Sequence, residues 1–227
     1  MKTLVSRWEG RELVELSAEG PPDGSAGEQA QALFNRFEVE LRRLGLSLDT
    51  TIRSRLWGRD RVSRDDGSRE RVATLAGRAR SASSSYISSS HFESSSDVAL
   101  DLWALRPAGP ATEKQLAEYD PAIVPLRYLT WEGLVVLSGV TAVLPTLDDQ
   151  VADILPRIEQ SLKLADSSWE RVVKMSCFLH RSQPLTSLQD LLARSIDVDI
   201  SLVEYGFVDG YSSEGKLVEI EVTALTN

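Results

Sequence analysis

Serine is concentrated in one segment of this chain, directly after an arginine. Residues 81–96 contain three runs of three serines and follow on from Arg80. A hydroxyl is a small donor and acceptor, and a guanidinium can bind a carboxylate through two parallel hydrogen bonds. The segment can therefore line a polar pocket beside Arg80, with Ser83 and Ser85 as candidate substrate-binding residues. The same serines also suit an exposed strand edge and loop, and the sequence leaves both interpretations open.

Other common patterns of catalysis and metal binding are absent from the sequence. No serine lies in a Gly-x-Ser-x-Gly turn, and no glycine-rich phosphate loop is present. His91 and His180 are isolated from other metal-ligating residues, and the single cysteine, Cys177, excludes an intrachain disulfide and cysteine-based zinc sites. We therefore expect no metal and no organic cofactor, so any chemistry has to come from arginine, carboxylate and hydroxyl groups.

These groups lie in a sequence that reads as one domain written twice, about 121 residues apart. The apolar pattern of residues 13–57 recurs at residues 134–178 without a gap. Near the end of each copy the shift becomes 120, which places Asp101 on Glu221. Agreement of this kind over whole elements is what duplication leaves behind. We predict two tandem domains, residues 1–107 and 123–227, joined by a linker at residues 108–122.

Each copy is predicted to have the element order β-β-α-β-α-β-β. This order favours an α+β fold, with a mixed sheet that carries both helices on one face. In the first copy we expect strands at residues 3–8, 13–17, 51–57 and 97–105, and helices at 28–45 and 69–78. In the second copy we expect strands at 126–131, 134–138, 171–179 and 217–224, and helices at 147–165 and 185–195, with Pro156 kinking the first helix or marking a late start. A further strand is expected before the last one in each copy.

Charge is shared unevenly between the two copies. The 227-residue chain has a net charge of −9, and residues 1–107 carry 16 basic and 16 acidic side chains, so the excess lies in residues 108–227. An acidic chain is a poor partner for phosphate backbones, which argues against nucleic acid as a ligand. The arginine-rich stretch 53–80 is the exception, and its interspersed acids predict a solvated face or an interface. No apolar run approaches the length of a membrane span.

Four segments of the second copy match the pattern of a known family, namely the strand at 133–139, the helix around 158–162, the strand at 172–179 and, most closely, the terminal run 217–222. Through these segments the second copy resembles the Rid (YjgF-like) family of small enamine/imine deaminases, which have a chorismate-mutase-like fold. The first copy resembles the family more weakly, through the same pattern and through the pair Arg80 and Ser81. Together the two copies cover nearly the whole chain.

The resemblance implies roles for several residues. The family arginine that binds the substrate carboxylate matches Arg80 in the first copy and Ile200 in the second. The family glutamate that positions the attacking water matches Asp101 and Glu221. A tyrosine near the start of the family domain is replaced by Leu126. The resemblance also implies three further substrate-binding candidates in the second copy, namely Arg127, Tyr128 and Ser138.

Two functions follow from this resemblance, and the sequence leaves both open. The first is a cofactor-independent, deaminase-like hydrolase or related lyase that acts on a small carboxylated metabolite, with Arg80, Asp101 and Glu221 as catalytic residues. The second is a non-catalytic metabolite-binding or scaffold protein, in which these residues form ordinary structural pairs. In either case we expect a cytoplasmic homo-oligomer, most simply a trimer, without nucleic acid or membrane partners.

Overall fold

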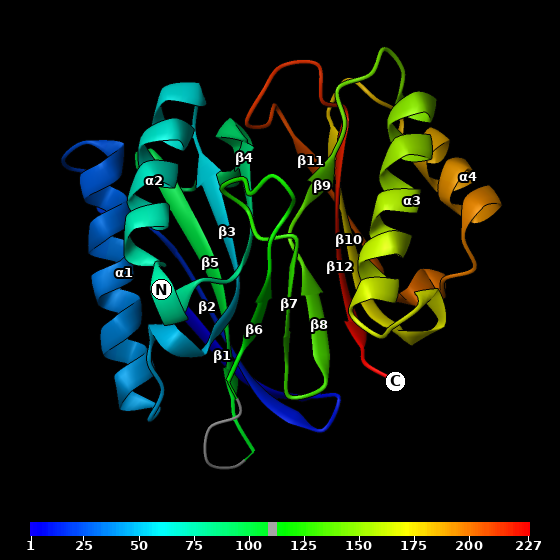
Figure 1. The fold of residues 1–227 in the computed structure, drawn as a ribbon. Coiled ribbons are helices and arrows are strands. Elements are labelled where there is room, and N and C mark those ends of the chain that lie inside the picture. Colours follow the sequence, from blue (N-terminus) through cyan, green and yellow to red (C-terminus); the bar gives the residue numbers. More distant parts are fainter. Residues whose placement is uncertain (109–112) are drawn as a thin grey trace. The chain divides into compact units, whose positions relative to one another are not determined.

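The computed structural model describes residues 1–108 and 113–227, and the chain divides into two compact units (Figure 1). Unit 1 is Met1–Lys114 and unit 2 is Gln115–Asn227. The segment expected to be a linker, 108–122, contributes a strand to unit 2 at residues 115–117, and its residues 109–112 lie outside the described residues.

Unit 1 is a five-stranded mixed sheet with two helices on one face (Figure 1). The strands follow the order β1-β2-β5-β3-β4, with only β3 and β4 parallel. The elements of unit 1 are β1 (Lys2–Trp8), β2 (Arg11–Glu19), α1 (Ala26–Arg43), β3 (Thr51–Gly58), α2 (Arg61–Thr74), β4 (Ala82–Ile87) and β5 (Val98–Arg106).

Unit 2 repeats this arrangement and extends the sheet. Its strands follow the order β11-β10-β12-β8-β7-β6, and β9 also pairs with β12. Helices α3 and α4 cover one face of this sheet (Figure 1). The elements are β6 (Gln115–Ala117), β7 (Tyr128–Trp131), β8 (Leu134–Leu137), β9 (Val140–Thr141), α3 (Leu147–Leu164), β10 (Val172–His180), α4 (Leu185–Ser195), β11 (Val203–Val208) and β12 (Val218–Leu225). The predicted α+β fold with two helices on one face of each sheet is confirmed.

The two faces of each sheet differ in chemistry because side chains alternate along a strand. In β5, Val98, Leu100 and Leu102 belong to the apolar core under the helices. Asp101 and Trp103 lie on the other side, which we call the helix-free face. In β12 the core residues are Val218, Ile220 and Val222, and the helix-free face carries Glu219, Glu221 and Thr223.

Local signals explain where the first helix of each unit begins. Ser25 and Glu28 form a reciprocal capping box before α1, with the Ser25 N–H 2.7 Å from Glu28 Oε2. Thr146 caps α3 by accepting a hydrogen bond from the Asp149 N–H at 3.1 Å. Pro156 lies inside α3, and the helix begins at Leu147, so the alternative of a late start is wrong.

Helix α2 begins at Arg61, eight residues before its predicted start at residue 69. Its buried positions are Ser63, Gly67 and Arg71, so the apolar periodicity that would mark the helix is missing. Gly67 is needed because a Cβ there would lie 2.9 Å from Val98 Cγ1. The helix packs close to the sheet through small and polar residues.

Each unit has a buried glutamine in the first turn of its first helix, and this side chain hydrogen-bonds to the backbone near the last strand. Gln29 Oε1 accepts from the Asp97 N–H at 2.8 Å, and its Nε2 donates to the Gly24 carbonyl at 3.3 Å. Gln150, 121 residues later, accepts from the Leu217 N–H at 2.8 Å. Its Nε2 donates to the carbonyls of Leu144 (2.8 Å) and Gly215 (2.7 Å). Both glutamines tie the first turn of a helix to the start of the last strand.

Candidate functional site

The helix-free face of unit 1 centres on the carboxylate of Asp101. Ser17, from β2, donates to Asp101 Oδ1 at 2.6 Å. The indole Nε1 of Trp57, from β3, donates to Asp101 Oδ2 at 2.7 Å. These donors come from the two strands that flank β5, so the sheet itself fixes the orientation of the carboxylate.

An arginine lies directly across from this carboxylate. Arg55 is the register partner of Asp101 on β3, and its guanidinium carbon lies 4.5 Å from the centre of the Trp103 ring. Arg55 is only 7% exposed, and Arg53 and Arg71 are buried as well. Of the two alternatives predicted for residues 53–80, a solvated face or an interface, the solvated face is therefore wrong for these three side chains.

Aromatic side chains surround the Trp57 indole that donates to this carboxylate. The Trp57 ring lies 5.0 Å from that of Tyr86 and is stacked on the His91 ring at 4.0 Å. Partial loss of hydration lowers the pKa of His91, while the negative charges of Asp101 and Glu19 act in the opposite direction. Burial thus favours the neutral form of the His91 ring, which lies within electrostatic reach of Asp101, a placement that its isolation in the sequence did not predict.

The serine-rich segment is fastened to this edge of unit 1. The Glu19 carboxylate accepts from the backbone N–H groups of Glu93 (2.8 Å) and Ser94 (3.0 Å), and also from the Ser94 hydroxyl. Arg59 Nε donates to the Ser96 carbonyl at 2.9 Å. The loop that carries His91 is thus held by charge-assisted hydrogen bonds at its far end.

Ser83 and Ser85 do not share the face of Asp101. The Ser85 hydroxyl accepts from Arg64 of α2, at 2.6 Å from Nη2 and 3.1 Å from Nε, so it points to the helices. Ser83 alternates with Ser84 and lies on the same side as Ser85. Ser84 is the β4 residue on the face of Arg55 and Asp101. The structure therefore leaves Ser83 and Ser85 out of the candidate site.

Arg80 lies before β4, at a distance from the Asp101 carboxylate. It precedes Ser84, the register partner of Arg55, by four residues, which is about 13 Å of extended chain. Its carbonyl accepts from Lys114 Nζ at 3.0 Å, and the Thr51 carbonyl accepts from the same ammonium at 2.8 Å. Within unit 1, Arg55 is therefore better placed than Arg80 to act together with Asp101.

The Lys114 ammonium gives a pH-dependent contribution to stability. Burial lowers its pKa from 10.5 to about 8, partly offset by Asp49. The unfolded chain then binds more protons between pH 8 and 10.5, so this lysine makes the protein more stable as the pH rises through that window. Relative to Lys114→Met, the wild-type free energy of unfolding should rise by about 3 kcal/mol between pH 7.5 and 10.5. Urea denaturation at several pH values measures this, and parallel curves for the two proteins would contradict it.

The helix-free face of unit 2 has carboxylates without the arginine. Glu221 is 1% exposed, and its register partner is Ser176, which occupies the place that Arg55 has opposite Asp101. The Ser176 hydroxyl donates to Glu204 Oε2 at 3.2 Å. Glu219 lies two residues before Glu221 on the same face and is also buried.

Glu219 packs against the backbone where β8 gives way to β9. A Cβ on Gly139 would lie 1.9 Å from Glu219 Oε1, so only glycine fits beside this carboxylate. Burial, together with the nearby charge of Glu219, raises the pKa of Tyr211, whose hydroxyl donates to the Phe178 carbonyl at 2.8 Å. Glu219 was not among the predicted site residues.

The remaining candidates of unit 2 are spread over both faces of its sheet. Arg127 binds α3, with Nε 2.9 Å from the Ser161 hydroxyl and Nη2 2.9 Å from Gln160 Oε1. Tyr128 packs against the core on the helix side, and Ser138 is buried. The structure does not bring Arg127 or Tyr128 to the face of Glu221.

The strand registers give the equivalences between the two units. Ser84 is the partner of Arg55, and Glu204 is the partner of Ser176, so β4 and β11 are related by a shift of 120. The same shift carries Arg80 onto Ile200, which is 63% exposed in a short turn before β11. The two units thus have equivalent strand pairings but different side chains at the candidate site positions. Ser176 replaces Arg55, and Ile200 replaces Arg80.

No group of three or more His, Cys, Asp or Glu side chains in the described parts of the chain is arranged to hold a metal ion. None of the helices described in either unit is long and apolar enough to cross a membrane.

Comparison with known proteins gives structural likeness only. No family model matches the chain, and no curated protein matches it in sequence. A solved chorismatase matches 97% of this chain over 78% of its own length, with 15% identity and a TM-score of 0.60. A YjgF/YER057c/UK114 family protein from Mycobacterium tuberculosis matches half of the chain over its full length, with 23% identity and a TM-score of 0.43. A Rid family protein from Yersinia pestis also matches half, with 20% identity and a TM-score of 0.46.

The match to chorismatase extends across both units. The chain therefore has the fold of chorismatase, in two compact α+β units.

Proposed function

We propose that the helix-free face of unit 1 binds a small carboxylated metabolite and hydrolyses it without a cofactor. One observation carries this proposal. The Asp101 carboxylate is oriented by donors from both neighbouring strands, and Arg55 lies directly across from it in the register. A fixed carboxylate beside a guanidinium supplies the two groups that hydrolysis of an imine or enamine of an α-keto acid requires.

Arg55 is the proposed carboxylate-binding group. A guanidinium binds a carboxylate through two parallel hydrogen bonds, which fixes the orientation of the adjacent carbon. The Trp103 ring beneath Arg55 restricts the plane of the guanidinium and adds a cation–π contact. The substrate carboxylate would thus lie over β3, with its reactive carbon turned toward β5.

Asp101 is the proposed general base. A carboxylate can accept about four hydrogen bonds, and Ser17 and Trp57 use two of these positions on Asp101. A water held at a remaining position gives one proton to Asp101 as its oxygen bonds to the imine carbon, and Asp101 passes this proton to the nitrogen, which forms a carbinolamine. The carbinolamine hydroxyl then gives its proton to Asp101, which passes it to the nitrogen as the carbon–nitrogen bond breaks, so that imine and water give ketone and ammonia. His91, stacked on Trp57 and within electrostatic reach of Asp101, is a second group able to carry a proton here.

Chorismate is a second substrate to test beside the imino acids. It is a small dicarboxylated metabolite, and chorismatase has this fold over 97% of the present chain. Cleavage of its ether bond would require the same two groups, Arg55 to bind a carboxylate and Asp101 to accept or donate a proton. The proposal therefore covers a deaminase-like hydrolase and a related lyase, with a common site.

The alternative is a binding protein without catalysis, and one observation favours it. Both oxygens of Asp101 already accept hydrogen bonds within unit 1, as in a carboxylate that serves structure. Ligand binding without product formation would support this alternative. The proposed cytoplasmic location is supported by the single cysteine of the sequence, and the proposed three-chain assembly by the family resemblance together with the terminal strands, which are apolar on one side.

Two arginine variants test the proposal. Ammonia release from enzymatically generated imino acids, and loss of chorismate, would be measured for the wild type, Arg55→Met and Arg80→Met. Truncating one partner of a charge-assisted pair costs roughly 2–5 kcal/mol, so Arg55→Met should lower kcat/KM by about 30-fold or more. Arg80→Met is the matched control, because it removes the same charge from the same unit, and it should have the smaller effect.

The reverse order of the two variants would assign carboxylate binding to Arg80, as the sequence alone implied, and would contradict the role of Arg55. If folded wild type turns over no carboxylated imine and no chorismate but binds one of them, the binding protein is the correct reading.

A further inference from the structure

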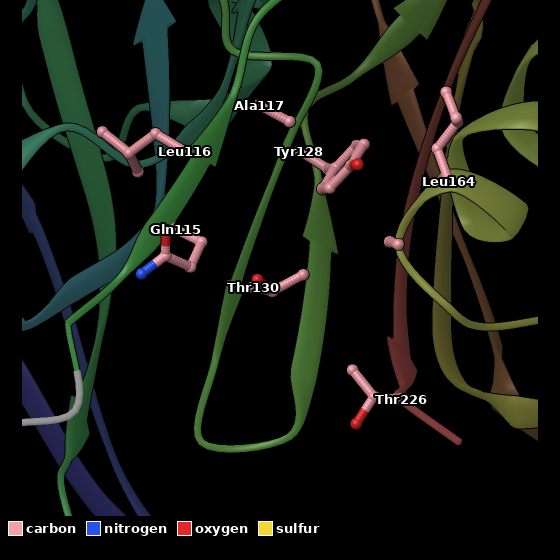
Figure 2. A pocket seen from close by; sticks show the side chains of 8 residues that line it. Gln115, Leu116, Ala117, Tyr128, Thr130, Leu164 and Thr226 are labelled. Carbon is pink, nitrogen blue, oxygen red and sulfur yellow. The ribbon is translucent and has the colours of Figure 1, made fainter.

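We propose that unit 2 has a separate binding site for an uncharged, hydroxylated aromatic molecule. The site is a cavity of about 370 Å³ between strands β6 and β7 and the end of helix α3 (Figure 2). This volume lies within the usual range for small-molecule pockets. The cavity is lined by Gln115, Leu116, Ala117, Tyr128, Thr130, Leu164, Ala165 and Thr226, which all belong to unit 2.

The cavity forms because the sheet of unit 2 continues through β7 and β6, beyond the strands on which α3 packs. Helix α3 packs on β8, β9 and β12. It ends at Leu164, and the chain turns away at Asp166, which has a positive φ of 54°. Strands β7 and β6 extend the sheet beyond this point. The side chains of β7 that point to the helix side therefore border an open space.

Two of these side chains supply the wall formed by the sheet. Tyr128 and Thr130 are two residues apart on β7, so they lie on the same face. Figure 2 shows the Tyr128 ring pointing toward Leu164, with Thr130 beneath it and Thr226 on the far side. Leu164 is 59% exposed, an apolar surface that a ligand would remove from water. A flat ring placed between Tyr128 and Leu164 would contact both.

The lining favours an uncharged ligand. None of the eight lining residues is charged, and four of them carry a hydroxyl or an amide, namely Gln115, Tyr128, Thr130 and Thr226. The C-terminal end of α3 has a partial negative charge, and the one basic residue of its last turn, Lys163, pairs with Glu159 at 2.6 Å. No lining residue is a cation that would offset the loss of hydration of a carboxylate, so a carboxylated ligand should bind more weakly than an uncharged one. The cavity therefore differs in ligand preference from the helix-free face of unit 1, where Arg55 is proposed to bind a carboxylate.

The chemical class of the ligand follows from the lining, which combines apolar and aromatic side chains with hydroxyl and amide groups. Aromatic rings pair with a tyrosine ring in offset or edge-to-face arrangements, and hydroxyls or carbonyls satisfy threonine and glutamine side chains. A phenol or a phenolic ester meets both requirements, because it has one apolar ring and a small number of uncharged polar groups.

The test uses methyl 4-hydroxybenzoate as the uncharged probe and 4-hydroxybenzoate as its charged counterpart. Backbone amide NMR shifts of the full-length protein would be followed during titration with each compound. We expect saturable shifts for the ester at Tyr128, Thr130, Ala165 and Thr226, with a Kd on the order of 1 mM or below, and binding of the anion at least about 10-fold weaker.

Variants make the test specific to the cavity. Thr226→Trp places a large ring in the cavity close to the C-terminus, where the fold is least at risk, and should weaken binding of the ester at least about 10-fold. Leu144→Trp adds the same ring near the opposite end of α3, about 27 Å away, and should leave binding unchanged. Tyr128→Ala should also weaken binding.

Three outcomes would overturn the proposal. They are the absence of saturable shifts for the ester at about 5 mM, wild-type affinity in Thr226→Trp, and equal binding of the ester and the anion. The last of these would disprove the chemical class, and the first two would disprove the site.

Discussion

Asp101→Asn is expected to lower kcat/KM by about 100-fold or more for any carboxylated substrate that the wild-type protein turns over. The amide keeps the shape of the side chain and one acceptor oxygen, but it cannot take a proton from water. Its NH2 group also faces a donor, either the Ser17 hydroxyl or the Trp57 indole, where the carboxylate accepted from both. Steady-state kinetics on folded protein would measure the loss.

Two further variants define what this result means. Asp153→Asn removes a carboxylate from an exposed pair with Arg157 on α3 and should leave kcat/KM unchanged. Glu221→Gln alters the equivalent carboxylate of unit 2, which has Ser176 in place of the arginine. If Glu221→Gln abolishes turnover and Asp101→Asn does not, the reaction takes place on unit 2 and the proposed site is wrong.

Gln150→Leu should lower the free energy of unfolding by about 3 kcal/mol or more. The side chain is completely buried and holds three backbone groups, the Leu217 N–H and the carbonyls of Leu144 and Gly215. Leucine has nearly the same volume, so the loss comes from leaving these groups without partners. Urea denaturation followed by circular dichroism would measure it.

The duplicated structure supplies its own comparison. Gln29→Leu should destabilise unit 1 by a similar amount, because Gln29 holds the equivalent backbone groups. Gln160→Leu lies on the exposed side of α3 and should change stability by no more than about 0.5 kcal/mol. Equal stability of Gln150→Leu and Gln160→Leu would show that the buried amide contributes nothing.

The sequence predicted the bounds of helices and strands well where the buried face of the element is apolar. Helices α1 and α3 and strands β3, β5, β10 and β12 lie within two residues of their predicted bounds, because their apolar residues repeat at the period of the element. Helix α2 was placed too late, since it faces the sheet with Ser63, Gly67 and Arg71. Its start was marked by Asp60, which caps the helix through a 2.8 Å hydrogen bond from the Ser63 N–H.

The candidate site was less predictable than the fold. Arg53 and Arg55 belong to an arginine-rich stretch that also contains exposed acids, so their burial could not be separated from the solvated pattern around them. One signal was available, because Arg53, Arg55 and Trp57 alternate along a strand and must share a face. His91 carried no such signal, since its contact with Trp57 joins residues 34 positions apart in the chain.

The strand order within the sheets has a consequence for how the chain folds. The last strand of each unit in sequence, β5 or β12, lies inside the sheet and pairs with neighbours on both sides. The two parts of each sheet, β1-β2 and β3-β4 in unit 1 and β6-β7-β8 and β10-β11 in unit 2, are therefore joined only by that last strand. Its contacts span long stretches of chain, which slows folding. During synthesis, the sheet of the first unit would be completed only by residues 98–106, and the sheet of the second only by residues 218–225. Deletion of residues 218–225 would thus remove an interior strand of a sheet, whereas deletion of residues 2–8 would remove only an edge strand.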